Sequence, residues 1–467
     1  MNGAAATPFR VQRAFERARA AHEAQDLETA WEVAGRAVAL APEYPAAAFL
    51  KAQIAFESWR PSVALFEQAL ALDQANPVLV RNFILALSAE KQEQRADALL
   101  SGILARNRNW LEGHALLSTL RLTCGESEPF RSYAEAAQAS PQDSSLRLAW
   151  FHRLATARQW DAAEAVLEAL EQDYANVAGV HAARLFLDCE TDRAPTGREI
   201  FAALANLADP GLALTEVRHA LRKGDPGHAD RVTARWIQTP HAPQFWPYRD
   251  LAWRLLDDPR HGWLGGDPAF ASTDDLDVEP SQLAELADFL RSLHQMQAPY
   301  PEQSVRGGTQ TPRNLLLHHD PRITRIRAKL ATAVTQWRDG LPSGDGGHPL
   351  LDRKPTKIRF AGSWSVRLLA NGHHSPHVHP QGWASSAFYV ALPQDLGNGE
   401  AGRFVLGMPP VELGLPLEPE RLIDPAPGRL ALFPSTSWHG TLPFSGEERL
   451  TLAFDIAPGL AKGDHPQ

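Results

Sequence analysis

The chain has 467 residues, which at roughly 150 residues per domain is enough for about three compact units, or for two if one of them is a repeat array. Hydrophobic residues make up 44% of the chain and charged residues 22%, so the sequence can build sizeable cores and global disorder is excluded. The 46 Lys and Arg residues against 55 Asp and Glu residues give a net charge of −9, and the basic residues form no dense run. We therefore expect neither a nucleic acid nor a membrane surface as a partner.

Cysteine usage and apolar runs bear on the compartment. Cys124 and Cys189 are the only two cysteines, too few for a disulfide framework and too far apart for a metal-binding or redox Cys-x-x-Cys pair. No stretch approaches the roughly 18 apolar residues of a membrane span, and the N-terminal residues contain no apolar core segment. These features predict a cytoplasmic protein.

The first half of the chain, up to about residue 235, has apolar residues at helical spacing, with proline mostly between the periodic segments. We expect consecutive helices. The ends of every second helix align at Pro42, Asp73, Asn107, Pro141 and Asp173, which are 31, 34, 34 and 32 residues apart. This spacing is the period of a two-helix repeat.

Two segments, 30–45 and 64–77, resemble the second helix and following turn of a tetratricopeptide (TPR) repeat. Small residues in such segments let neighbouring helices pack closely, and the stacked pairs form a superhelix with a concave face. An ordinary helical bundle with accidental periodicity is the alternative. We predict a TPR-like helical repeat domain over residues 1–240.

After Pro240 tryptophan, proline and glycine become more frequent, and we predict a second domain over residues 241–467. A helix beginning at a proline is expected over 280–295. From about 355 to 460 short strand-like runs alternate with Gly/Pro turns, which indicates a sandwich or jelly roll. These runs are 357–360, 364–369, 387–392, 403–406, 428–433 and 449–454. The predicted class is α+β.

Histidines near the C-terminal end of the chain have the spacing of a metal site. His377 and His379 are two residues apart, so in an extended segment their imidazoles project from the same face. His439, just after the run 428–433, can complete a triangle from a neighbouring strand. Three ligands on one face of an octahedral metal leave positions open, as in non-haem Fe(II) facial sites. A solvated histidine cluster is the alternative.

Arg449 and Thr451 occupy one face of the last predicted strand. A guanidinium and a hydroxyl that point together into a barrel are suited to holding a carboxylate through charge-assisted hydrogen bonds. A surface arginine is the alternative interpretation.

Taken together, the segment 377–379, the run 428–434 leading to His439, and residues 449–451 resemble a 2-oxoglutarate/Fe(II)-dependent oxygenase. More narrowly, segments 303–311 and 377–390 resemble a bacterial family of 2OG-Fe(II) oxygenases whose members often carry N-terminal TPR repeats. The catalytic resemblance covers roughly residues 260–460. It implies a double-stranded β-helix (jelly-roll) domain with flanking helices.

The resemblance also implies roles for single residues. His377 is expected as the first iron ligand, His439 as the distal ligand, and Arg449 with Thr451 as the partners of the 2-oxoglutarate C5 carboxylate. One position departs from the superfamily pattern, because His379 stands where Asp or Glu is usual. Either a three-histidine site or a two-histidine site with water is possible. Tyr389, on a predicted barrel strand, is a candidate contact to the co-substrate, although a strand aromatic is more often a core residue.

The expected function is therefore an Fe(II)- and 2-oxoglutarate-dependent dioxygenase. A protein or peptide substrate is expected on the concave face of the repeats, because helical solenoids commonly hold extended peptides. Two other functions remain open at this point: a cupin-like three-histidine metal enzyme, which needs no equivalent of Arg449, and a non-catalytic TPR scaffold.

Overall fold

The computed structural model describes residues 8–294, 303–344 and 346–459. The chain divides into two compact units, one formed by residues 1–132 with 312–328 and the other by residues 133–311 with 329–467. Within the described ranges, no helix combines the length and the apolar composition needed to cross a lipid bilayer.

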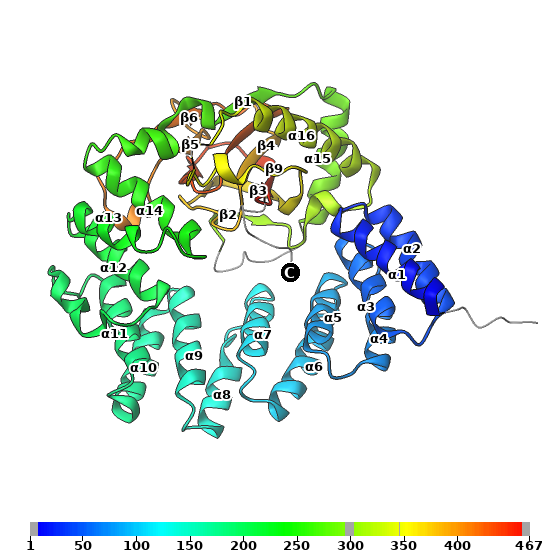
Figure 1. Cartoon of the computed structure of the whole chain (residues 1–467), viewed down its shortest axis with the longest axis horizontal. Coiled ribbons are helices and arrows are strands. Elements are labelled where there is room, and N and C mark those ends of the chain that lie inside the picture. Colours follow the sequence, from blue (N-terminus) through cyan, green and yellow to red (C-terminus); the bar gives the residue numbers. More distant parts are fainter. Residues whose placement is uncertain (1–7, 295–302, 345, 460–467) are drawn as a thin grey trace, which may run out of the picture. The chain divides into compact units, whose positions relative to one another are not determined.

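Helices account for almost all of the chain up to residue 255 (Figure 1). Their bounds are α1 (Pro8–Glu23), α2 (Leu27–Leu40), α3 (Pro45–Glu57), α4 (Val63–Leu72), α5 (Pro77–Ala89), α6 (Glu93–Arg106), α7 (Leu111–Thr123), α8 (Arg131–Ala139), α9 (Ser144–Thr156), α10 (Trp160–Tyr174), α11 (Ala178–Glu190), α12 (Pro210–Arg222), α13 (Pro226–Ala234) and α14 (Ala242–Leu255). Helices α2, α4, α6, α8 and α10 end within a few residues of the positions predicted from the sequence, which confirms the two-helix period.

The turns between paired helices repeat as regularly as the helices do. A residue with a left-handed backbone occurs every 32 to 34 residues, which is the conformation that ends a helix in an αL cap. These residues are Gln25, Trp59, Lys91, Gly125, Arg158, Asp192, Gly224 and Asp257. The series continues past the compositional change at Pro240, so α14 keeps the geometry of the repeat.

Small residues explain the close packing of neighbouring repeat helices. In the first unit, Ala18 of α1 and Ala30 and Ala34 of α2 are buried in one cluster with Leu50 and Ile54 of α3. An alanine side chain lets helix axes approach closely and still removes apolar surface from water. The alanine-rich composition of this half of the chain is therefore a packing requirement.

The remaining part of the second unit is built on two antiparallel sheets, one of six strands in the order β1-β7-β4-β9-β3-β2 and one of three in the order β6-β5-β8. The strand bounds are β1 (Ser272–Asp275), β2 (Val305–Gln310), β3 (Phe360–His374), β4 (Ala384–Ala391), β5 (Phe404–Leu406), β6 (Arg421–Ile423), β7 (Arg429–Pro434), β8 (His439–Thr441) and β9 (Glu448–Ile456). Two further helices of the chain are α15 (Pro280–Leu293) and α16 (Pro321–Gly340), and residues 321–328 of α16 belong to the first unit. Shorter helical turns are η1 (Arg198–Leu204), η2 (Gly262–Gly266), η3 (Pro268–Phe270), η4 (Leu315–Leu317), η5 (Leu351–Arg353) and η6 (Val411–Leu413).

The predicted β region is confirmed in outline, but β6 and β8 inside it had no predicted counterpart, and β1 and β2 lie before residue 355. Residues 357–359 precede β3, and the two expected strands at 357–360 and 364–369 form one long strand from Phe360 to His374. The helix expected over 280–295 is α15, which ends at Leu293, and Gln295 lies outside the described residues.

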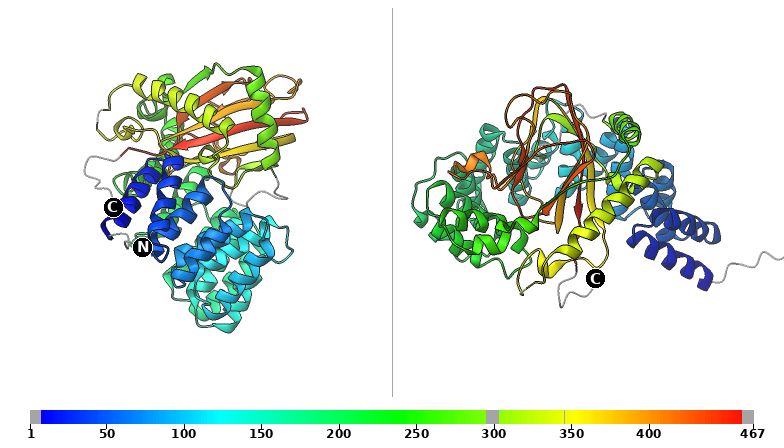
Figure 2. Two further views of the ribbon diagram at one scale, coloured as in Figure 1. Left: turned by 90° about the vertical axis from the view of Figure 1, so that its right-hand side faces the viewer. Right: turned by 90° about the horizontal axis from the view of Figure 1, so that it is seen from above.

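The two sheets enclose a common interior. Tyr389 of β4 and Phe433 of β7 belong to the larger sheet and pack with Phe404 of β5 and Ile423 of β6 from the smaller sheet. Helix α15 packs against β4 of the larger sheet, as Figure 2 shows. The larger sheet is thus covered on both faces, and six of the nine residues of β9 are buried, from both sides of the strand. The architecture is α+β, with a TPR-like helical region followed by a jelly roll.

Candidate metal centre

Three histidines, His377, His379 and His439, each offer a ring nitrogen within 4.8 Å of the others. His439 opens β8, and its backbone pairs with His377 through two hydrogen bonds of 2.9 and 3.0 Å. The ring centroids of His377 and His439 are 4.2 Å apart, and each lies 5.0 Å from that of His379. The β8 pairing therefore brings a histidine from a distant part of the chain beside the His-x-His segment.

Nδ1 of each of the three histidines forms a hydrogen bond within the protein. Nδ1 of His377 donates to the carbonyl of Ser375 at 2.8 Å, and Nδ1 of His439 donates to the carbonyl of Ser437 at 3.0 Å. A carbonyl only accepts, so the proton of both rings is on Nδ1 and the lone pair is on Nε2. This is the tautomer that a metal ligand needs.

Burial keeps the two rings neutral. Desolvation, reinforced by the neighbouring imidazole of His379, lowers the pKa of His377 to about 3. Burial likewise holds the pKa of His439 well below its usual range, with His377 and His379 adding to the effect. Neutral imidazoles offer their lone pairs at physiological pH without first losing a proton.

The third histidine is oriented by a carboxylate that sequence reasoning missed. Nδ1 of His379 lies 2.7 and 2.8 Å from the two carboxylate oxygens of Asp455 on β9. Ser385 of β4 donates to the same carboxylate at 2.6 Å and contacts Ser435 at 2.8 Å. The sequence did contain a signal, because Asp455 is four residues after Thr451 and so lies on the same face of the strand.

Arg449, the predicted carboxylate partner, is 2% exposed. Its Nη1 donates to the carbonyl of Gly402 at 2.8 Å and its Nη2 to the hydroxyl of Tyr389 at 3.3 Å, while its Nε is buried without a hydrogen-bond partner. Among the residues that the structure describes, it forms no ion pair. Burial lowers the pKa of this guanidinium and raises that of the Tyr389 hydroxyl. A buried cation without an acidic partner is costly, which is typical of a side chain that waits for an anionic ligand.

The predicted residues share one interior. Thr451 lies opposite Tyr389 across the β4–β9 pairing and two residues from Arg449, so the three side chains face the same side of the sheet. Tyr389 packs in the inner cluster with Phe433, whose ring centroid is 4.7 Å from that of His439. Arg449 and the histidine triad thus line neighbouring parts of the same space.

Helices of the repeat region support the backbone around the histidines from outside. Val378, between the first two histidines, and Trp438, just before the third, pack in one apolar cluster with residues of α12, α13 and α14. Nε1 of Trp438 donates to the carbonyl of Pro247 in α14 at 3.1 Å, and its ring lies 5.4 Å from that of Tyr248. Helices on both sides of residue 240 thus pack against the segments that carry the triad.

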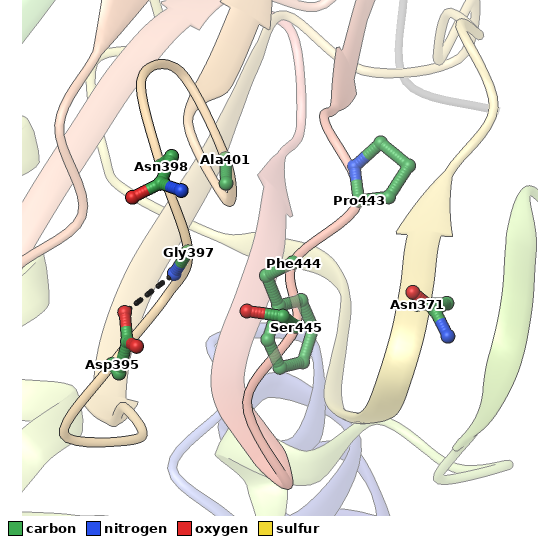
Figure 3. A pocket seen from close by; sticks show the side chains of 8 residues that line it. All are labelled: Asn371, Asp395, Gly397, Asn398, Ala401, Pro443, Phe444 and Ser445. Atoms are coloured by element: carbon green, nitrogen blue, oxygen red, sulfur yellow. Dashed lines mark hydrogen bonds between the residues drawn. The ribbon is translucent and has the colours of Figure 1, made fainter.

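A pocket of about 400 Å³ lies away from the histidines, between the β4–β5 loop and the β8–β9 loop (Figure 3). Asn371, Asp395 and Asn398 contribute polar groups to it, and Asp395 accepts a hydrogen bond from the Gly397 amide at 2.8 Å. Phe444 forms part of its wall. None of the predicted site residues lines this pocket.

Residues 362–455 match the model of a family described as "Putative 2OG-Fe(II) oxygenase". This match contains all three histidines and Arg449, and it confirms the resemblance predicted from the sequence. No curated protein matches the chain.

Several solved structures are partly similar. A prolyl-4-hydroxylase from Pseudomonas putida is 14% identical, with a TM-score of 0.28, and the similarity covers 44% of this chain and 97% of that chain. HygX from Streptomyces hygroscopicus with nickel and 2-oxoglutarate bound is 12% identical over 43% of this chain and 86% of that chain, with a TM-score of 0.30. A tetratricopeptide repeat protein from Parabacteroides merdae is 13% identical over 54% of this chain and 98% of that chain, with a TM-score of 0.32.

Proposed function

We propose, from the match of residues 362–455 to the 2OG-Fe(II) oxygenase family, that the protein is an Fe(II)- and 2-oxoglutarate-dependent dioxygenase that hydroxylates a protein or peptide. The observation that carries the proposal is the combination of two features in one interior. Three imidazoles that converge within 4.8 Å lie near a buried guanidinium that forms no ion pair with any described residue.

The donor set fits iron. His377 and His439 present neutral Nε2 atoms, because their Nδ1 protons are bound to carbonyls. His379 would be the third ligand, and Asp455 behind it would strengthen it as a donor, as carboxylates do for metal-bound histidines. Imidazole nitrogens suit Fe(II), and three ligands on one face leave positions for a bidentate co-substrate.

The interior also fits a dicarboxylate. Arg449 would bind one carboxylate of 2-oxoglutarate, with the hydroxyls of Thr451 and Tyr389 as further partners on the same face. The hydrogen bonds to Gly402 and Tyr389 hold the guanidinium in place before the ligand arrives, so little side-chain freedom is lost on binding.

When bound, the iron would supply the oxygen-activating redox chemistry. The chain's own residues orient the metal and the co-substrate and limit the access of water. Phe404 and Phe433 flank His439 at ring-centroid distances of 6.0 and 4.7 Å, and Trp364 lies 5.4 Å from His379. These rings shield the partly buried histidines from water, and contacts made in such a low-dielectric environment are stronger than they would be in water.

The substrate part of the proposal rests on the helical region. Stacked helix pairs with a regular period form extended concave surfaces that hold peptides. We therefore assign recruitment of a protein or peptide to the TPR-like repeats. Incubation of the protein with cell-lysate proteins, Fe(II), 2-oxoglutarate and ¹⁸O₂ should add one labelled oxygen to a small set of proteins. Labelling of free metabolites alone would contradict this assignment.

A cupin-like three-histidine enzyme is the second candidate, and one observation favours it: His379 stands where most oxygenases have a carboxylate ligand. The two candidates differ in their need for 2-oxoglutarate.

The decisive experiment is an anaerobic titration of the protein with Fe(II) and then with 2-oxoglutarate. We expect a weak visible metal-to-ligand charge-transfer band, and succinate formation once oxygen is admitted. His377→Ala and His439→Ala should lose the band, because two remaining neutral ligands hold iron weakly, whereas His379→Asp should retain it. Iron binding without any response to 2-oxoglutarate would favour the cupin-like enzyme.

A further inference from the structure

A fourth histidine, His374, faces the same interior as the metal centre and Arg449. We propose that His374, supported by Ser304, is a co-substrate-binding residue that donates a hydrogen bond from Nε2 to a carboxylate oxygen of 2-oxoglutarate. The inference rests on the proposed function and adds a second donor to the one supplied by Arg449.

Strand register places His374 on the inner face. It lies opposite Val305 in the β2–β3 pairing, and directly opposite residues project to the same side of a sheet. Val305 is fully buried in a cluster with Leu368, and Leu368 lies opposite Arg449 in the β3–β9 pairing. The side chains of His374 and Arg449 therefore share one face of the sheet.

The ring of His374 is held next to the metal centre. Its centroid lies 5.8 Å from that of His377, with the two ring planes 22° apart. Its backbone amide donates to the hydroxyl of Thr441 on β8 at 2.9 Å, which ties the end of β3 to the strand that carries His439. The His374 side chain thus lies beside the metal centre, on the sheet face that also carries Arg449.

Ser304 determines which nitrogen of His374 carries the proton. The Ser304 hydroxyl lies 2.9 Å from Nδ1 of His374 and 3.2 Å from Nε2 of His377. Once the lone pair of His377 Nε2 is used for a metal, this nitrogen no longer accepts a hydrogen bond from the hydroxyl, and the Ser304 hydroxyl donates to Nδ1 of His374 instead. The remaining proton of a neutral His374 is then on Nε2, to which no residue in the described part of the chain forms a hydrogen bond.

The neighbouring histidine provides a matched control. His373 lies opposite Arg306 in the same pairing and so projects to the other side of β3, where its Nδ1 is 3.4 Å from the carbonyl of Asn371 in an exposed contact. A substitution at His373 removes the same chemical group one residue away without reaching the interior.

The test is anaerobic calorimetry of 2-oxoglutarate binding to the full chain loaded with Ni(II), with the Ni(II) affinity of each variant measured separately. His374→Leu should bind 2-oxoglutarate about 10- to 100-fold more weakly, the loss expected for one hydrogen bond to a charged group. His374→Gln keeps an N–H donor and should recover most of the affinity. Ser304→Ala should have a smaller effect, and His373→Leu should match the wild type.

Each result has a definite meaning. A loss of 2-oxoglutarate affinity in His374→Leu with Ni(II) affinity unchanged, and its recovery in His374→Gln, supports the proposal. Equal 2-oxoglutarate affinity in His374→Leu and the wild type overturns it, as does a parallel loss of Ni(II) affinity, which would make His374 a structural neighbour of the metal. Failure of the Ni(II)-loaded wild type to bind 2-oxoglutarate overturns the proposed function as well.

Discussion

Asp455 accepts a hydrogen bond from His379 although the two residues are 76 positions apart, with Nδ1 of the histidine 2.7 and 2.8 Å from the two carboxylate oxygens. Most oxygenases of this superfamily place a carboxylate in the position of His379, whereas here a carboxylate lies directly behind the imidazole. The pair resembles the carboxylate–histidine–metal arrangements in which a second residue raises the basicity of the ligand.

Removal of this carboxylate should weaken metal binding. We expect Asp455→Ala to lower the affinity for Fe(II) or Ni(II) about 10- to 100-fold, because His379 loses its orientation and part of its donor strength. Asp455→Asn should be milder, since an amide oxygen still accepts the Nδ1 proton. Calorimetric metal titration measures both, with Asp395→Asn as a control carboxylate that contacts no histidine of the triad. Unchanged metal affinity in Asp455→Ala would show that His379 is not a ligand.

Arg449 should lower the stability of the metal-free protein and raise its affinity for 2-oxoglutarate. Replacement by Met of a buried cation that forms no ion pair with the described residues removes its desolvation cost, so the unfolding free energy of the metal-free protein should stay the same or rise by about 1 kcal/mol. Affinity for 2-oxoglutarate should nevertheless fall by roughly two to three orders of magnitude, because the ligand loses its charge-assisted contact. Arg449→Lys should be intermediate, and Thr451→Ala should cost on the order of 1 kcal/mol.

Urea denaturation and calorimetry test these two expectations separately. Arg429→Met is a suitable control, because Arg429 is also a strand arginine but pairs with Asp275 through its side chain. Full 2-oxoglutarate affinity in Arg449→Met would mean that the arginine is structural.

The contact between Trp438 and Pro247 should matter for the metal centre. Trp438→Phe keeps the aromatic packing against Tyr248 but loses the hydrogen bond to α14, which frees the backbone just before His439. We expect metal affinity to fall about five-fold, corresponding to roughly 1 kcal/mol. Trp253→Phe is the matched control, because it removes an indole hydrogen bond to Asp230 from the same helix without touching the histidines. Equal metal affinities for the two variants would contradict a positioning role for Trp438.

The same contact bears on the domain boundary. A domain boundary at residue 240 remains a prediction. Such a boundary would divide one apolar cluster, because residues of α12 and α13 pack in it together with Val378 and Trp438. A loss of metal affinity in Trp438→Phe would show that α14 helps to position the metal centre.

Stability should depend on pH through His261. Its imidazole lies 2.8 Å from Asp250 and 2.8 Å from Glu420, and hydrogen bonds to these carboxylates raise its pKa to about 9, with Arg254 also near Asp250. A folded-state pKa above the unfolded value near 6.5 stabilises the protein fully below pH 6.5, and this contribution disappears as the pH rises to about 9.

The unfolding free energy of the wild type should therefore fall by about 1–2 kcal/mol more than that of His261→Gln between pH 6.5 and pH 9. Urea denaturation followed by tryptophan fluorescence at several pH values measures the difference. Parallel pH profiles for the two proteins would exclude a charged His261 in the folded state.

Much of the architecture was predictable from the sequence because it depends on local patterns. Alanine-rich helical periodicity predicted helix ends that the structure confirms near Leu40, Leu72 and Arg106, since helix formation and the packing of adjacent repeats involve residues close in the chain. Strands β4, β5, β7 and β9 were likewise visible as short apolar runs between turns, whereas the three-residue strands β6 and β8 were not predicted. The pattern failed at β3, where Gly362 suggested an interruption but a bulge lets the strand continue.

The candidate site likewise has features that local sequence predicted and features that only the tertiary structure decided. His377 and His379 are neighbours in the sequence, and Arg449 and Thr451 share a strand face, so local geometry was enough to pair the members of each set. Only the tertiary structure decided that Asp455 supports His379, that His374 faces the interior while His373 does not, and that α14 supports Trp438. Each of these depends on strand register or helix docking between segments far apart in the chain, and a one-residue change in register would turn every side chain of a strand to its other face.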